Sequence, residues 1–331
     1  MASFFIGFFL LSCIMKMETF YLKETTTMNK RVHLAGILFS TIFGLSFMFS
    51  KIALDTVLPI GLIAYRFILA YLVFEILRLT KIVKINFHRS HLKLALMVGL
   101  LQPVLYFLFE TYGLNYLKSS EAGMMIALIP IFVTIFSAII LKEKPKPLQV
   151  FFILLSVGGI VFIQLNRTSN GFSHEFLGFF LLFLAVISAA LFNIASRFSS
   201  KTIPTKELTY YMMLIGAITF NGIYLVTLIV QKRPLDYVRN LMHIELLLPI
   251  LYLGIIASIG GFFLVNFTLK NLEAHVSSIY ANLATIVSIL AGYFLLNEAI
   301  YYYHIIGSAM IIIGVYGTVS LNRGIKRVKI K

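Results

Sequence analysis

Arg66 and Glu110 of this 331-residue chain are charged residues inside long apolar runs, where a charge without a partner is costly. Arg66 lies in the run 58–79, roughly 10 Å from its nearer end, and Glu110 lies in the run 93–114. An arginine in such a position binds a carboxylate or another anion of a ligand, or it forms an ion pair that joins two helices. A structural Arg66–Glu110 pair is our first expectation, and a contact between Arg66 and a ligand is the alternative.

A second set of residues is polar or aromatic and is spread over several apolar runs of both halves of the chain. Its members are Ser46, Phe49, Gln102, Tyr106, Asn193, Phe262, Asn266, Ser277, Tyr280 and Asn282. Lipid cannot form hydrogen bonds, so polar side chains on apolar helices point toward protein or water. We expect the set to line a weakly polar cavity with aromatic walls. For any one member, a hydrogen bond between helices is an equally good interpretation.

The sequence offers little for catalysis or for cofactors. A single cysteine, Cys13, excludes disulfide frameworks and zinc clusters. His88 and His91 lack a third metal ligand nearby, and the chain contains no HExxH, GxSxG or nucleotide-binding GxxxxGK[ST] motif. We therefore expect no enzyme activity, no cofactor and no metal. The net charge of +15 does not predict nucleic-acid binding, because the basic residues lie in short loops between apolar runs.

The elements that position these residues follow from composition. Hydrophobic residues make up 60% of the chain, charged residues 12%, and the mean hydropathy is +0.93. Apolar runs close to the ~20 residues of a membrane span fall at 32–53, 58–79, 93–114, 119–141, 147–165, 176–198, 208–230, 246–269, 275–297 and 303–321. This pattern predicts an all-α integral membrane protein with ten transmembrane helices.

The chain also repeats itself with a shift of 155 positions. Phe107, Leu114, Leu117, Leu128, Ile131, Leu141, Glu143 and Gly159 recur as Phe262, Leu269, Leu272, Leu283, Ile286, Leu296, Glu298 and Gly314. Five helices per repeat is an odd number, so the second repeat crosses the membrane in the opposite direction. We expect a first repeat at 32–165 and an inverted second repeat at 176–321. An extension at 1–31, which we expect to be dispensable, precedes them, and a basic tail at 322–331 follows.

The basic residues are distributed unequally between the two sides of the predicted bundle. Of the 28 Lys and Arg residues, 21 fall in segments on the side of the amino terminus and six in loops on the other side. Cytoplasmic loops carry such an excess of Lys and Arg. We therefore expect a multi-pass protein of the plasma membrane with both termini in the cytoplasm.

Several short motifs follow one another along the chain in a characteristic order. They are Gly36, Phe43-Gly44-Leu45-Ser46, Lys51, Pro59, Arg66-Phe67, Pro130, Leu141-Lys142-Glu143, Leu295-Leu296-Asn297-Glu298, and Gly307, Gly314 and Gly317 in the last helix. Through them the chain resembles the drug/metabolite transporter superfamily, of the EamA type, across residues 30–321. The resemblance implies ten helices in two inverted repeats and a central cavity.

A duplicated membrane bundle is typical of carriers, because a site between two related halves can open to each side in turn. We expect a secondary transporter, monomeric or homodimeric, that exports amino acids, amphipathic metabolites or drugs. Several embedded cations would be needed for polyanions, and Arg66 is the one available. Proton coupling through Glu110 and simple facilitated diffusion both remain open. A lipid or lipid-linked-sugar translocase is the alternative that the resemblance admits.

Overall fold

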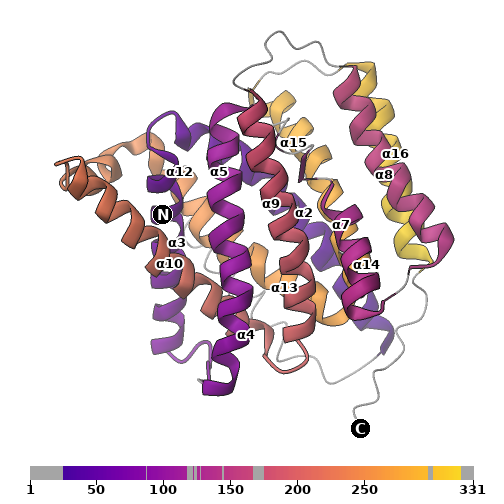
Figure 1. The fold of residues 1–331 in the computed structure, drawn as a ribbon, viewed down its shortest axis with the longest axis horizontal. Coiled ribbons are helices and arrows are strands. Elements are labelled where there is room, and N and C mark those ends of the chain that lie inside the picture. The colour runs from indigo at the N-terminus through magenta and orange to yellow at the C-terminus, as the bar shows by residue number, and fades with distance from the viewer. Residues whose placement is uncertain are drawn as a thin grey trace.

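The computed structural model describes residues 25–86, 88–117, 122, 125–126, 128–143, 145–166, 175–296 and 301–321. These residues form helices and no strand, packed side by side into one bundle (Figure 1). Most of the predicted extension at 1–31 and the tail at 322–331 lie outside the described residues. The first helix begins at Thr25, upstream of the predicted start at residue 32.

Within the described residues, seven helical segments are long and apolar enough to cross a membrane, and three apolar helices are shorter. The seven are Lys30–Leu54, Pro59–Leu79, Arg89–Tyr116, Phe176–Ser199, Thr205–Val230, Ile244–Asn271 and Ala274–Leu295. The three shorter ones, Ile129–Leu141, Pro147–Ile163 and Ile305–Thr318, coincide with the predicted spans 119–141, 147–165 and 303–321. Many large apolar side chains on these helices are exposed on the outside of the bundle, as expected of a surface that meets lipid. The prediction of an all-α membrane protein is confirmed.

The helices pack in pairs, and the pairing in one repeat is the same as in the other. The second helix of one repeat, α3 (Pro59–Leu79), packs on its equivalent in the other, α10 (Thr205–Val230), and the fifth, α8 (Pro147–Leu165), packs on α16 (Tyr302–Ser320). The first helix, α2 (Thr25–Leu54), packs on α15 (Ala281–Leu296). Its equivalent α9 (Glu175–Ser199) packs on α7 (Ile129–Phe136) in the same way. Exchanging the two repeats therefore leaves the packing scheme unchanged.

Contact between α2 and α15 requires a residue without a side chain. A Cβ at Gly44 would lie 2.6 Å from the carbonyl oxygen of Ala284 on α15. Small residues let helix backbones approach closely in membranes, where close packing replaces the hydrophobic effect as the main attraction between helices. Gly44 therefore brings α2 against the second repeat, next to the cavity described below.

The span 93–114, which we predicted as one helix, is interrupted. It consists of α4 (Arg89–Gly99), the π-helical segment η1 (Leu100–Leu105) and α5 (Tyr106–Tyr116). Gln102 has extended backbone angles (φ −150°, ψ 116°). The cause is Pro103, which lacks an amide hydrogen and disfavours the helical conformation for the residue before it. The interruption puts the side chain of Gln102 at the cavity.

Two spans of the second repeat are interrupted as well. The eighth consists of α12 (Ile244–Leu251), the π-helical segment η4 (Tyr252–Gly261) and α13 (Phe262–Asn271). The ninth divides at Tyr280 into α14 (Ala274–Ile279) and α15. The hydroxyl of Ser40 on α2 donates to the backbone carbonyl of Tyr280 at this division. The interruption is thus supported by the first repeat.

Candidate functional site

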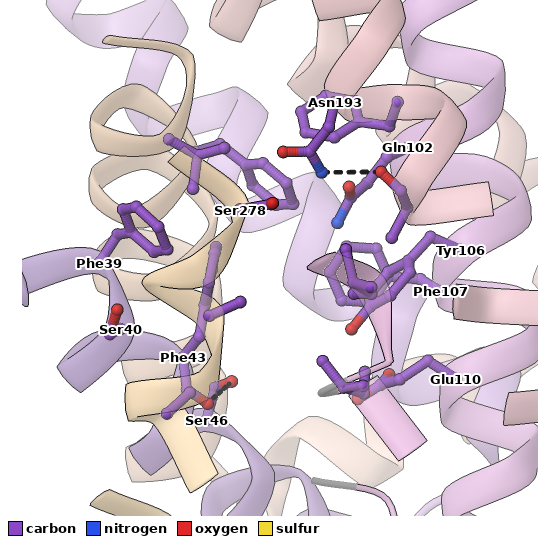
Figure 2. A pocket seen from close by; sticks show the side chains of 18 of the residues that line it. Phe39, Ser40, Phe43, Ser46, Gln102, Tyr106, Phe107, Glu110, Asn193 and Ser278 are labelled. Carbon is purple, nitrogen blue, oxygen red and sulfur yellow. Dashed lines mark hydrogen bonds between the residues drawn. The ribbon is translucent and has the colours of Figure 1, made fainter. Parts of the chain in front are cut away.

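A cavity lies between the two repeats, with walls from α2, α3, η1, α5, α7, α9, α13, α14 and α15. It encloses about 770 Å³, including the part that is open to the outside. In Figure 2, Phe39, Phe43 and Ser46 on one side face Tyr106 and Glu110 on the other.

Arg66 lines the cavity and is 3% exposed. Its Nε donates a hydrogen bond of 2.7 Å to the hydroxyl of Ser258 on η4, and its guanidinium lies 4.3 Å from the ring centroid of Phe107. These contacts fix the side chain from both repeats. Among the described residues, the bond to Ser258 is the one hydrogen bond of the Arg66 side chain, which leaves its two terminal nitrogens available for a group that enters the cavity.

Glu110 lies in the same cavity and is 4% exposed. The hydroxyl of Thr111 donates to its Oε2 at 3.0 Å, which leaves the other carboxylate oxygen without a partner in the described chain. Arg66 and Glu110 attract each other electrostatically, but among the described residues they form no direct ion pair, so the expected Arg66–Glu110 pair is not present as a contact. The physical reason is that Arg66 is held by Ser258 and Phe107 instead.

Six of the ten predicted polar and aromatic residues line the cavity: Ser46, Gln102, Tyr106, Asn193, Phe262 and Ser277. Three of these also make interhelical or local bonds: Ser46 donates to the carbonyl of Phe43, Asn193 donates to the carbonyl of Ala189, and Ser277 shares a 2.8 Å hydrogen bond with Thr268. These six positions lie at the cavity, and their role in binding solute stays a prediction.

The other four lie outside the walls of the cavity, and each is engaged elsewhere. Phe49 stacks on Tyr252 with 4.3 Å between ring centroids, and the Tyr280 hydroxyl is 2.6 Å from Nδ1 of His33. Asn266 accepts a hydrogen bond from Ser196 and donates one to Thr209, and Asn282 donates to Ser156. These positions hold helices together, which was the alternative interpretation for every member of the set.

Several residues of the cavity were not predicted. They are Phe39, Ser40, Phe43, Phe107, Phe192 and Ser278, among others. Phe107 could have been found, because it is the repeat equivalent of Phe262, which was predicted. The two rings meet edge to face with centroids 6.0 Å apart, so the repeat places equivalent aromatic residues against each other in the cavity.

Comparison with known proteins agrees with this architecture. The model of the EamA-like transporter family matches the chain twice, at residues 30–165 and 176–320. The chain is 38% identical over 296 residues to "Uncharacterized transporter YcxC" of Bacillus subtilis (strain 168), covering 89% of this chain and 95% of that one. It is 28% identical over 278 residues to an "Uncharacterized transporter" of Archaeoglobus fulgidus, covering 83% and 94%.

A solved structure titled "Crystal structure of protein" shares the fold with a TM-score of 0.69 at 19% identity, covering 90% of this chain and 98% of that one. The two matches to the family model cover nearly all of the residues in the predicted repeats. On these grounds the chain belongs to the EamA-like transporter family, within the drug/metabolite transporter superfamily, and is a membrane transporter.

Proposed function

We propose that the protein is a secondary carrier that exports small solutes with both a carboxylate and an ammonium group, with neutral amino acids as the first candidates. The observation that carries the proposal is the pair of charges in the cavity. Arg66 offers two terminal nitrogens and Glu110 offers a carboxylate oxygen, none of which forms a hydrogen bond within the described chain. A guanidinium binds a carboxylate through two parallel hydrogen bonds, and a carboxylate accepts hydrogen bonds from an ammonium group.

The aromatic walls account for the rest of such a solute. Phe43, Phe107 and Phe262 form a chain of edge-to-face contacts, with centroids 5.5 Å apart for the first and last of these rings. When an amino acid packs its apolar side chain against these rings, the apolar surface of that side chain is removed from contact with water. Burial of apolar surface contributes about 25 cal/mol per Å². The cavity thus offers an apolar wall beside two opposite charges, which suits an amino acid better than a polyanion.

Alternating access follows from the repeats. Residues of α2, α3 and α5 from the first repeat and of α9, α13 and α14 from the second surround the same cavity. A site at the interface of two related halves becomes open to one side or the other when the halves rock against each other. The excess of Lys and Arg on the side of the termini supports a cytoplasmic location for both ends of the chain.

Purified protein in liposomes tests the proposal. We expect saturable flux of a labelled neutral amino acid, above that of empty liposomes, and competition by other neutral amino acids. The assay is repeated with a pH gradient, because a gradient that accelerates flux indicates proton coupling and one without effect indicates facilitated diffusion. Absence of saturable flux for every amino acid, with protein that remains folded in the liposomes, would refute the assigned solute class.

A further inference from the structure

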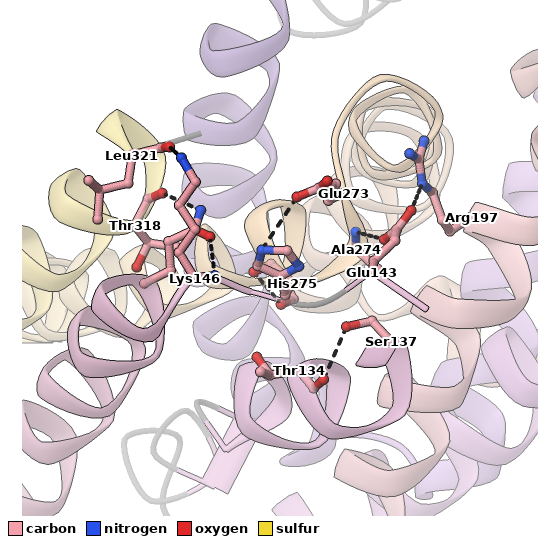
Figure 3. A network of polar contacts seen from close by, with 12 residues as sticks. Thr134, Ser137, Glu143, Lys146, Arg197, Glu273, Ala274, His275, Thr318 and Leu321 are labelled. Carbon is pink, nitrogen blue, oxygen red and sulfur yellow. Dashed lines mark hydrogen bonds and ion pairs between the residues drawn. The ribbon is translucent and has the colours of Figure 1, made fainter. Parts of the chain in front are cut away.

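Glu143 joins segments of both repeats at one end of the bundle. It follows the π-helical segment η2 (Ser137–Leu141), which ends at Lys142 in the left-handed conformation (φ 58°). One oxygen of the Glu143 carboxylate accepts a hydrogen bond of 3.0 Å from Nε of Arg197 at the end of α9. The other oxygen accepts the backbone N–H of Ala274, also at 3.0 Å, where α14 begins (Figure 3).

Arg197 extends the same network to a third segment of the second repeat. Its Nη1 donates to the carbonyl oxygens of Leu269 at 3.0 Å and Lys270 at 2.9 Å, at the end of α13. The side chains of Glu143 and Arg197 are 17% and 16% exposed. Hydrogen bonds between charged groups that are largely shielded from water are stronger than those on an open surface. We call this set of contacts, from Glu143 through Arg197 to the three segments, the inner clamp.

The inner clamp and the cavity wall share helix α14, on which their residues are close in sequence. Ser277 and Ser278 line the cavity, and Ala274 precedes Ser277 by three residues on α14, about 4.5 Å along the helix axis. α14 also packs against α7 and α9, the helices that lead to Glu143 and Arg197. A movement of α14 away from Glu143 would therefore open the cavity wall at this end.

The equivalent place at the other end of the bundle also contains a cation, and Glu298, the repeat equivalent of Glu143, lies outside the described residues. Nζ of Lys51, at the end of α2, donates to the carbonyl oxygens of Leu114 at 3.3 Å and Leu117 at 3.2 Å. Leu114 is the repeat equivalent of Leu269, so both ends use a cation on the last carbonyls of equivalent helices. In the described part of the chain, however, Lys51 has no carboxylate partner.

We infer that the inner clamp is the gate that closes the cavity toward the cytoplasm, and that its release admits solute from that side. The inference rests on the proposed carrier function and on the assignment of this end to the cytoplasm by the charge distribution. The gate works because one carboxylate ties the first repeat to two helices of the second. When its bonds to Arg197 and to the Ala274 N–H are broken, α14 and α9 separate from η2 together.

The test measures access to the cavity without any solute. In a Cys13→Ser background, Ala281→Cys on the cavity wall serves as the reporter, and inside-out vesicles present the cytoplasmic side to a membrane-impermeant maleimide. We expect Arg197→Gln to raise the labelling rate about tenfold, as the loss of charge-assisted hydrogen bonds implies. Arg78→Gln is the matched control, because Arg78, which pairs with Glu75 beside Tyr210 of α10, belongs neither to the inner clamp nor to the lining of the cavity.

Glu143→Gln serves as a second variant in case Arg197→Gln does not fold, and it should raise labelling in the same way. Thermal unfolding of each variant in detergent verifies the fold. Labelling of the two clamp variants at the rate of the reporter alone, or an equal increase in the Arg78→Gln control, would overturn the inference. The labelling assay uses no solute, so its result does not depend on the outcome of the amino-acid flux assay. Failure of the solute assignment can therefore be distinguished from failure of the gate.

Discussion

Replacement of Arg66 by glutamine tests how the cavity distinguishes solutes. Glutamine keeps an amide that can form hydrogen bonds but removes the positive charge and the planar fork that faces the cavity. The change also removes the Nε bond to Ser258 and the contact of the guanidinium with the Phe107 ring. A solute carboxylate would then face the cavity wall without a cation.

The expected magnitude follows from the bonds that are lost. Each hydrogen bond to a charged group contributes about 1.5–3 kcal/mol, and each 1.4 kcal/mol corresponds to roughly a tenfold change in affinity. For a neutral amino acid we therefore expect the KM of Arg66→Gln to rise between about 10-fold and 150-fold. For the corresponding amine, which lacks the carboxylate, KM should change by less than about twofold, within the few tenths of a kcal/mol typical of an uninvolved position.

Initial rates of flux into liposomes, measured with both solutes, provide the comparison. Arg78→Gln, which removes an arginine outside the cavity, should leave both KM values unchanged. An equal rise in KM for the amine and the amino acid would contradict the reasoning, since Arg66 would then serve the fold and not the carboxylate. An unchanged KM for the amino acid would contradict it as well.

Three further predictions concern positions around the cavity and the ends of the bundle. Ser258→Ala should raise the KM for amino acids about tenfold with little change in the maximal rate, and Ser258→Thr should restore it, because the hydroxyl orients Arg66. Gly159→Ala should lower the unfolding temperature in detergent, whereas Gly158→Ala should not. A Cβ at Gly159 would lie 2.6 Å from a backbone oxygen of α16, but a Cβ at Gly158 would lie 3.5 Å from its nearest neighbour, the side chain of Met310. Burial and a neighbouring carboxylate raise the pKa of Glu273, so its ionised form is disfavoured in the folded protein. Stability should fall as pH rises through this raised pKa, and Glu273→Gln should reduce that fall in unfolding scans at successive pH values, whereas an unchanged pH dependence would contradict the assignment.

The length of the apolar runs predicted the class of fold, because run length is a property of the local sequence, whereas the orientation predicted from the charge asymmetry stays a prediction. The breaks within the spans were not predicted from these runs. The division before Pro103 has a local cause, but the division at Tyr280 is supported by Ser40 from a helix more than two hundred residues earlier in the chain. Such support depends on packing, which apolar periodicity does not reveal.

The residues of the cavity were predictable in part. A polar side chain on an apolar helix must face protein or water, and this rule correctly predicted that Gln102 and Asn193 lie at the cavity. The same rule could not separate them from Asn266 and Asn282, whose partners lie on neighbouring helices. Aromatic residues carry no such constraint, so Phe107 was identifiable only through its equivalence with Phe262.

Counterflow in liposomes tests the central claim most directly, namely that one cavity between the two repeats is exposed to each side in turn. Liposomes that contain the purified protein are loaded with unlabelled amino acid and diluted into a trace of the labelled form, with no ion gradient. A carrier exchanges one for the other, so labelled solute should accumulate inside above its external concentration and then decline, and Arg66→Gln, with its raised KM, should reduce the overshoot. Label that only equilibrates, with no dependence on the internal load, would contradict alternating access through a shared site.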